Sequence, residues 1–151
     1  MKIYNIKEKQ EYIEEVATLT KLEWAEYNNE AELNNKIQET INKIKNNLKN
    51  PNYCKLILLD KNKLVGFISI FPKDGDECQE LTPWYATMYV KKEYRGLGYS
   101  KILNDAILKE AKRRGFKKIY LKSELKNYYE KFGAKYIKKL QNGEKVYYID
   151  L

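Results

Sequence analysis

The segment 94–101 holds the residues whose types and spacing are most suggestive of chemistry. It reads Tyr-Arg-Gly-Leu-Gly-Tyr-Ser-Lys and lies between an expected strand, 84–90, and an expected amphipathic helix, 100–114. A turn that leads into a helix presents several backbone N–H groups that lack a helical partner, at the positive end of the helix dipole. Gly96 and Gly98 carry no Cβ that would hold a ligand away from the backbone. The segment therefore indicates a site for an anion, above all a pyrophosphate.

The spacing excludes two common phosphate-binding loops. A Walker loop needs four residues between its glycines and then Gly-Lys-Ser/Thr, and the chain has no such string. A dinucleotide fingerprint needs a third glycine and an early place in a βαβ unit, and both are missing. What remains is Arg95-x-x-Gly98-x-Ser100, in which the serine hydroxyl could also cap the helix.

The chemistry open to this chain is limited by the absence of histidine. Ser-His-Asp and Cys-His catalysis and the usual zinc ligand sets are excluded, so we expect no metal. An enzyme built from this sequence must use carboxylates, tyrosine, lysine, backbone amides or a bound cofactor. Cys54 and Cys78 form neither a disulfide framework nor a Cys-x-x-Cys pair.

The length and composition are those of a single globular domain, which we place at residues 1–151. Hydrophobic residues make up 43% of the chain and charged residues 33%. There is no run of eighteen apolar residues and no apolar core of a signal peptide near Met1. The expected location is therefore the cytoplasm, without a membrane partner.

The net charge of +8 is distributed unevenly. Residues 1–35 hold four lysines against eight glutamates, whereas residues 91–140 hold sixteen Lys/Arg against five Asp/Glu. The basic half is either a solvated lysine surface, a nucleic-acid patch or the docking site of a phosphorylated coenzyme. The coenzyme is favoured because the phosphate-binding segment lies in the same half. A cationic amine would then approach from the acidic half.

The elements that position these residues follow from periodicity and turn residues. We expect strands at 2–6, 53–59, 63–71, 84–90, 118–121, 134–140 and 145–150, and helices at 8–27, 31–48, 100–114 and 127–132. The order is β-α-α-β-β-β-α-β-α-β-β.

This order and two motifs resemble the GNAT superfamily of N-acetyltransferases. Arg95-x-x-Gly98-x-Ser100 is similar to the family's pyrophosphate loop, with serine in place of the usual last glycine or alanine. The segment 127–134, Asn-Tyr-Tyr-Glu-Lys-Phe-Gly-Ala, is similar to a second family motif, with Ala134 in place of an aromatic residue. The resemblance implies an α/β (α+β) fold with a mixed sheet of about six to seven strands, about four helices, and splayed fourth and fifth strands.

The resemblance also implies acetyl-coenzyme A as cosubstrate and a set of residues that bind it. Backbone groups of the fourth strand would hold the pantetheine arm, one N–H would polarise the thioester, and the loop would cover the pyrophosphate. The implied binding residues are Met88, Tyr89, Val90, Arg95, Gly96, Leu97, Gly98, Tyr99, Ser100, Lys101 and Asn127.

Direct attack by an amine then needs a base and an acid. By the resemblance Tyr129 protonates the departing thiolate, with Tyr128 as the alternative. Glu80, at the entrance to the fourth strand, is the expected general base, acting directly or through water, although it could equally be an ordinary loop carboxylate. Asp74, Asp76 and Glu77 would help to attract a cationic acceptor.

Three readings of the whole chain remain open. The leading one is an N-acetyltransferase that acts on a primary amine of a small molecule or peptide. The others are an acyl-coenzyme A-binding module of the same fold without turnover and, less favoured, a basic nucleic-acid-binding domain. An exposed terminal hairpin would also suit pairing in a homodimer.

Overall fold

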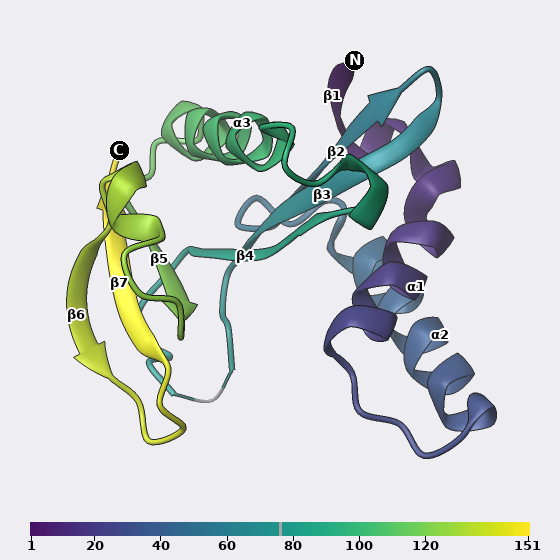
Figure 1. The fold of residues 1–151 in the computed structure, drawn as a ribbon, viewed down its shortest axis with the longest axis horizontal. Coiled ribbons are helices and arrows are strands. Elements are labelled where there is room, and N and C mark those ends of the chain that lie inside the picture. Colours follow the sequence, from purple (N-terminus) through teal and green to yellow (C-terminus); the bar gives the residue numbers. More distant parts are fainter. Residues whose placement is uncertain (76) are drawn as a thin grey trace.

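One seven-stranded sheet organises the chain, with helices on both of its faces (Figure 1). The computed structural model describes residues 1–75 and 77–151, so Asp76 lies outside the described residues. The strand order is β1-β2-β3-β4-β5-β7-β6. Neighbouring strands are antiparallel, except that β4 and β5 are parallel. This is the mixed sheet that the sequence predicted.

The elements follow one another as β1 (Lys2–Asn5), α1 (Ile13–Trp24), α2 (Glu30–Asn47), β2 (Cys54–Asp60), β3 (Lys63–Phe71), β4 (Trp84–Val90), α3 (Tyr99–Arg113), β5 (Lys118–Ser123), β6 (Lys135–Lys139) and β7 (Lys145–Asp150). A single 3₁₀ turn, Tyr129–Phe132, lies between β5 and β6. The predicted order of elements is confirmed.

Two predicted helices are shorter than expected. The helix predicted at 8–27 begins only at Ile13, because Lys9 leaves the helical region (φ −136°, ψ 55°) and breaks the preceding residues into two 3₁₀ turns. In place of the helix predicted at 127–132, the structure has only the 3₁₀ turn Tyr129–Phe132. Asn127 (φ +55°) and Gly133 (φ +89°) both have left-handed backbone and bound it on either side.

The helices divide between the two faces of the sheet (Figure 1). Leu56 and Leu58 of β2 pack in one cluster with Leu103 of α3, whereas Ile57 packs in another with Val16 of α1. Because both faces are covered, β2 and β3 are almost continuously apolar instead of alternating. Within the described residues, no helix has both the length and the apolar character that crossing a membrane requires.

The parallel strands β4 and β5 diverge after a short contact (Figure 1). In the described part of the chain they share one registered pair, Trp84 with Tyr120, beside a hydrogen bond from Tyr120 N–H to Pro83 C=O (3.0 Å). The later residues of β4 therefore have no strand partner on this side. Unpaired backbone groups need a ligand or water. The predicted splay is confirmed.

An irregularity in β4 lies beside this open edge. Phe67 pairs with Tyr89 and Ser69 with Ala86, so β4 has one more residue than β3 over this stretch. Thr87 accommodates it with φ +49°, which a β-branched residue seldom adopts. The arrangement is a β-bulge, a feature common next to active sites.

The C-terminal hairpin ends the sheet at β6, whose residues are all exposed. Lysines at both ends of β6 make it a poor template for further strands. Pairing of this hairpin in a homodimer remains a prediction.

Candidate active site

Two cavities meet at the open edge of β4. The loop cavity, about 490 Å³, lies between β4 and the segment 94–100. The strand cavity, about 420 Å³, lies between β4 and β5. Glu23, Met88 and Tyr129 line both cavities, so these three side chains mark their junction.

Most of the predicted site residues gather around the loop cavity. Its lining includes Met88, Tyr89, Val90, Arg95, Gly96, Gly98, Tyr99, Ser100 and Tyr129. Residues from three separate stretches of the sequence are thus brought together, as the resemblance implied.

The start of α3 forms one wall of the loop cavity. Gly98 is the N-cap residue, with φ +86°, and Gly96 has φ +77°. The first hydrogen bond of the helix runs from Ile102 N–H to Gly98 C=O (3.4 Å), so the N–H groups before it have no helical acceptor. Ser100 lies inside the helix, and no side chain caps α3, so the capping role suggested for this serine is wrong. The uncapped N–H groups are free to bind an anion.

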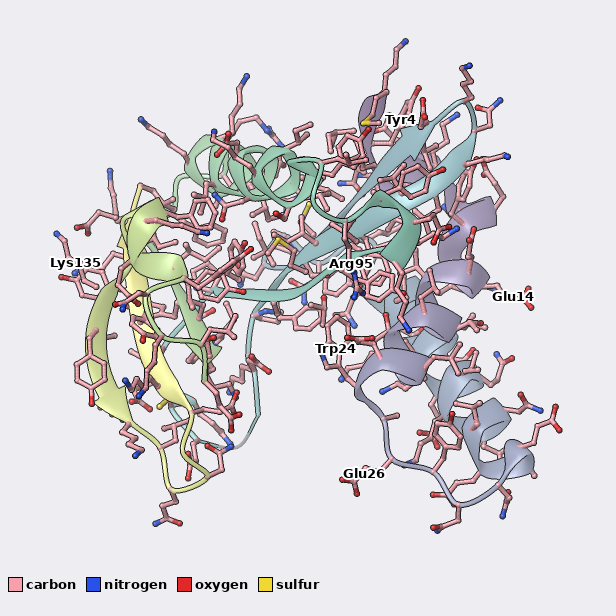
Figure 2. The ribbon with its side chains drawn as sticks, in the orientation of Figure 1. Tyr4, Glu14, Trp24, Glu26, Arg95 and Lys135 are labelled. Atoms are coloured by element: carbon pink, nitrogen blue, oxygen red, sulfur yellow. The ribbon has the colours of Figure 1, made fainter. Side chains whose placement is uncertain are left out.

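Arg95 connects the loop to the end of β4. Its Nε donates to Val90 C=O at 2.8 Å, and its guanidinium lies over the Tyr89 ring, with Cζ 5.5 Å from the centroid. Trp24 of α1 meets the same ring edge-on, with the centroids 6.2 Å apart. Figure 2 shows Arg95 and Trp24 near the middle of the molecule, where α1 and β4 meet. The Val90 carbonyl is therefore already occupied by Arg95.

Tyr129 stands where the two cavities join. Its ring packs edge-on against Tyr85 (centroids 5.8 Å apart) and Tyr128 (4.8 Å). Burial raises the pKa of Tyr129 to about 12, with a further rise from Tyr128. The phenol is therefore protonated at neutral pH and can donate a proton at the junction. Tyr128 lines only the loop cavity.

Comparison with known proteins identifies the family of this site. The family described as "Acetyltransferase (GNAT) family" matches residues 13–134. The chain belongs to the GNAT acetyltransferase family. It is therefore an enzyme of the acetyltransferase class, as the sequence predicted. A comparison of the sequence with curated proteins finds no match.

Solved structures show the same fold over almost the whole chain. The aminoglycoside 6'-N-acetyltransferase from Enterococcus faecium is 19% identical with a TM-score of 0.73, over 99% of this chain and 97% of that one. An N-acetyltransferase from Staphylococcus aureus Mu50 is 18% identical with a TM-score of 0.73, over 99% and 97%. The PaiA N-acetyltransferase from Thermoplasma acidophilum, solved with coenzyme A, is 22% identical with a TM-score of 0.66, over all of both chains.

The GNAT site fits acetyl-coenzyme A as the acetyl donor. The uncapped amides at the start of α3 suit a pyrophosphate, and the unpaired edge of β4 suits the pantetheine amides. Family membership supports this donor.

Two carboxylates of this GNAT chain lie at the strand cavity. Glu23, near the end of α1, is exposed and lines both cavities. Asp74 is half-buried and lines the strand cavity beside Lys122, whose Nζ donates to Asp74 C=O at 2.6 Å and lies 3.8 Å from Oδ1. Burial raises the pKa of Asp74, although Lys122 opposes the rise. Glu80 is exposed and does not line either cavity.

The remaining predicted residues lie outside the two linings. Leu97 is 62% exposed at the tip of the loop, and Lys101 is paired with Asp105 at 2.8 Å. Asn127 has left-handed backbone ahead of the 3₁₀ turn. Their contribution to coenzyme binding remains a prediction.

Sequence reasoning missed Glu23 and the contact of Tyr85 with Tyr129. Glu23 is one of eight glutamates in the first 35 residues, and only the packing of α1 beside β4 distinguishes it. Tyr85 O–H donates to Asn104 Oδ1 of α3 at 2.9 Å, and burial raises its pKa. Its ring braces that of Tyr129. No short-range pattern connects residues this far apart.

Replacing Gly98 by Ala should weaken coenzyme A binding. No atom lies within 4 Å of an added Cβ, so the effect comes from the left-handed backbone, which costs a non-glycine residue about 1–2 kcal/mol. Relaxing that strain would turn the helix amides away from the loop cavity. Calorimetry with coenzyme A should show the loss of affinity.

Gly115→Ala is the matched control at the other end of α3. Gly115 has φ +89° and equally open surroundings, so the Gly115→Ala variant should lose a similar amount of stability and keep its affinity for coenzyme A. Equal affinities for the two variants would contradict a role for the α3 amides.

Proposed function

We propose that this protein transfers an acetyl group from acetyl-coenzyme A to a primary amine by direct attack in a ternary complex. The observation that carries the proposal is the junction of the loop and strand cavities at Glu23, Met88 and Tyr129. The coenzyme occupies the loop cavity and the amine approaches through the strand cavity. Holding both reactants at one point supplies the proximity that the reaction needs.

The backbone of β4 stabilises the reacting carbonyl. One N–H group of residues 88–90, on the edge that β5 leaves open, donates to the thioester oxygen and to the oxyanion that follows. The amides at the start of α3 neutralise the pyrophosphate. Tyr129 protonates the thiolate of coenzyme A as it leaves.

Direct attack is favoured because the two cysteines are unsuited to carry an acetyl group. Both are buried, and neither lines the loop cavity or the strand cavity. Burial raises the pKa of Cys54 to about 11, so it stays a thiol at neutral pH. Initial rates at varied concentrations of both substrates should give intersecting double-reciprocal lines. Parallel lines would show a covalent acetyl-enzyme instead.

Glu23 is the carboxylate best placed to take the proton of the attacking amine. It lines both cavities, whereas Glu80 lines neither. We expect Glu23→Gln to lower kcat/KM for the amine about 100-fold, within the usual contribution of a general base. Thiol release at fixed acetyl-coenzyme A measures this.

Glu80→Gln is the matched control for Glu23→Gln, because it removes the same charge from a residue that lines neither cavity. It should leave kcat/KM almost unchanged. A large loss in Glu80→Gln with full activity in Glu23→Gln would return the role of base to Glu80, as the sequence predicted. The double variant Glu23→Gln/Asp74→Asn tests whether the two carboxylates that line the strand cavity act together.

The acceptor is expected to be cationic because Glu23 and Asp74 both line the strand cavity, where Lys122 offsets only one of the two carboxylates. A thiol-release assay over polyamines, aminoglycosides, amino acids and peptides identifies it. The aminoglycosides belong in this panel because the Enterococcus faecium relative is an aminoglycoside 6'-N-acetyltransferase. Turnover with none of the amines would overturn the proposed acceptor class.

A further inference from the structure

A third cavity, about 400 Å³, opens on the face of the sheet that α1 and α2 cover. Its walls come from Thr20 and Lys21 of α1, from Lys43 of α2, and from Lys55 of β2. The proposed acetyl transfer uses none of these side chains. We call it the lysine cavity.

Lys55 is the unusual residue of the lysine cavity, because its side chain is buried without an acidic partner. It is 3% exposed, and its Nζ donates to Ser69 Oγ at 2.5 Å and, at 3.5 Å, to Thr87 Oγ1. No ion pair in residues 1–75 and 77–151 includes Lys55. A lysine has three donors, so at least one remains for a ligand.

The surroundings of Lys55 add positive charge instead of cancelling it. Lys21, Lys43 and Lys73 also line the cavity, and none of its described lining residues is acidic. The rings of Phe67 and Phe71 lie 5.3 and 5.4 Å from Lys55 Nζ, which favours a cation but does not neutralise it. A buried charge of this kind is expensive unless something pairs with it.

Another part of the wall is apolar and partly aromatic. Tyr53 and Phe71 are stacked, with centroids 5.6 Å apart and an interplanar angle of 13°. Ile44 and Pro72 complete this side of the cavity. The lysine cavity thus combines apolar and aromatic side chains with a buried cation, a composition common in small-molecule sites.

We propose that the lysine cavity binds a small organic carboxylate with an apolar or aromatic body. The carboxylate pairs with Lys55 through a charge-assisted hydrogen bond, and the body lies against Tyr53 and Phe71. Ser69 of β3 and Thr87 of β4 accept hydrogen bonds from the ammonium group and hold it in position.

Two kinds of molecule can supply the carboxylate, because the lysine cavity adjoins the strand cavity at Thr87. Thr87 lines both the lysine cavity and the strand cavity. The carboxylate belongs either to the amine acceptor or to a separate molecule bound beside the acceptor. The first source rests on the proposed function. Binding in the lysine cavity is the same chemistry in both cases.

Binding should depend on pH through Lys55. Burial lowers the pKa of Lys55 to about 7, and a bound carboxylate raises it again. Affinity is therefore highest below about pH 7 and falls as the pH rises through that value, with proton uptake on binding. Among the described residues, the other titratable groups facing the cavity are Lys21, Lys43, Lys73 and Tyr53. Burial raises the pKa of Tyr53, which stays neutral.

Calorimetry at pH 6.5 with 3-phenylpropionate tests the proposal, with 3-phenylpropanol and 2-phenylethylamine as neutral and cationic counterparts. The wild-type protein should bind the carboxylate and neither counterpart. Lys55→Met should lose at least about tenfold in affinity, as expected when a charge-assisted bond is removed. Lys63→Met, at an exposed position of β3, should bind like wild type.

Coenzyme A binding shows that Lys55→Met is folded, because the loop cavity does not include Lys55. Removal of a buried charge in favour of an apolar side chain is often neutral for stability. No binding of 3-phenylpropionate to wild type, or equal binding to Lys55→Met, would overturn the proposal. Because this measurement needs no turnover, it stands or falls separately from the acetyl transfer.

A pair of amines then separates the two sources. Benzylamine and 4-(aminomethyl)benzoate differ only in the carboxylate. A lower KM for the second, lost in Lys55→Met, assigns the carboxylate to the acceptor. Equal KM values, with 3-phenylpropionate still binding in the presence of saturating amine, assign it to a separate molecule. Both results retain the carboxylate site.

Discussion

Tyr129→Phe should lower kcat about 100-fold, within the usual contribution of a general acid. Tyr129 lines both cavities, and burial keeps it protonated with a pKa of about 12. The variant keeps the ring that packs against Tyr85 and loses only the hydroxyl. Thiol release under saturating substrates measures kcat, and calorimetry should show nearly unchanged affinity for acetyl-coenzyme A.

Tyr128→Phe provides the control, because it removes the same hydroxyl one residue earlier. Tyr128 lines the loop cavity but not the strand cavity, so it does not reach the junction. Its kcat should remain close to that of wild type. A full rate in Tyr129→Phe, or the larger loss in Tyr128→Phe, would contradict the assignment of Tyr129 as proton donor.

Gly66→Ala should destabilise the fold and weaken coenzyme A binding together. An added Cβ would lie 2.4 Å from Tyr89 backbone O, 3.2 Å from Val90 Cα and 3.1 Å from the Leu103 side chain. Backbone atoms cannot rotate away, so β3 and β4 must separate. We expect a loss of about 3 kcal/mol, at the upper end of the usual effect of overpacking. Urea unfolding measures the stability.

Gly143→Ala is the control for Gly66→Ala, because it adds a Cβ without a clash. Gly143 has φ +94° in the β6–β7 turn, with no atom within 4 Å of the new Cβ. It should lose some stability through backbone strain and keep its affinity for coenzyme A. If Gly66→Ala kept both properties, the close approach of β3 to the end of β4 would be wrong.

Local patterns predicted the elements that depend on neighbouring residues. The strands at 63–71, 84–90 and 145–150 agree with β3, β4 and β7, because apolar runs bounded by turn residues define them. The loop before α3 was found for the same reason, since its proposed function depends on the backbone and on glycine spacing. The start of α1 was missed because the unusual conformation of Lys9 has no sequence signature.

Features that depend on packing between distant elements were not predicted. Glu23 reaches the junction only because α1 lies beside β4. Lys55 stands in the apolar run of β2, where an alternating strand would expose it, but α1 and α2 cover that face. The bulge at Thr87 is likewise a property of the β3–β4 register. Each of these depends on tertiary structure that periodicity does not contain.

A crystal structure with bound coenzyme A tests the central claim most directly. The account predicts the diphosphate at the amides of residues 96–101, the pantetheine arm in the loop cavity along the open edge of β4, and the thiol next to Tyr129. A diphosphate bound elsewhere, or a pantetheine arm that lies outside the loop cavity, would contradict it.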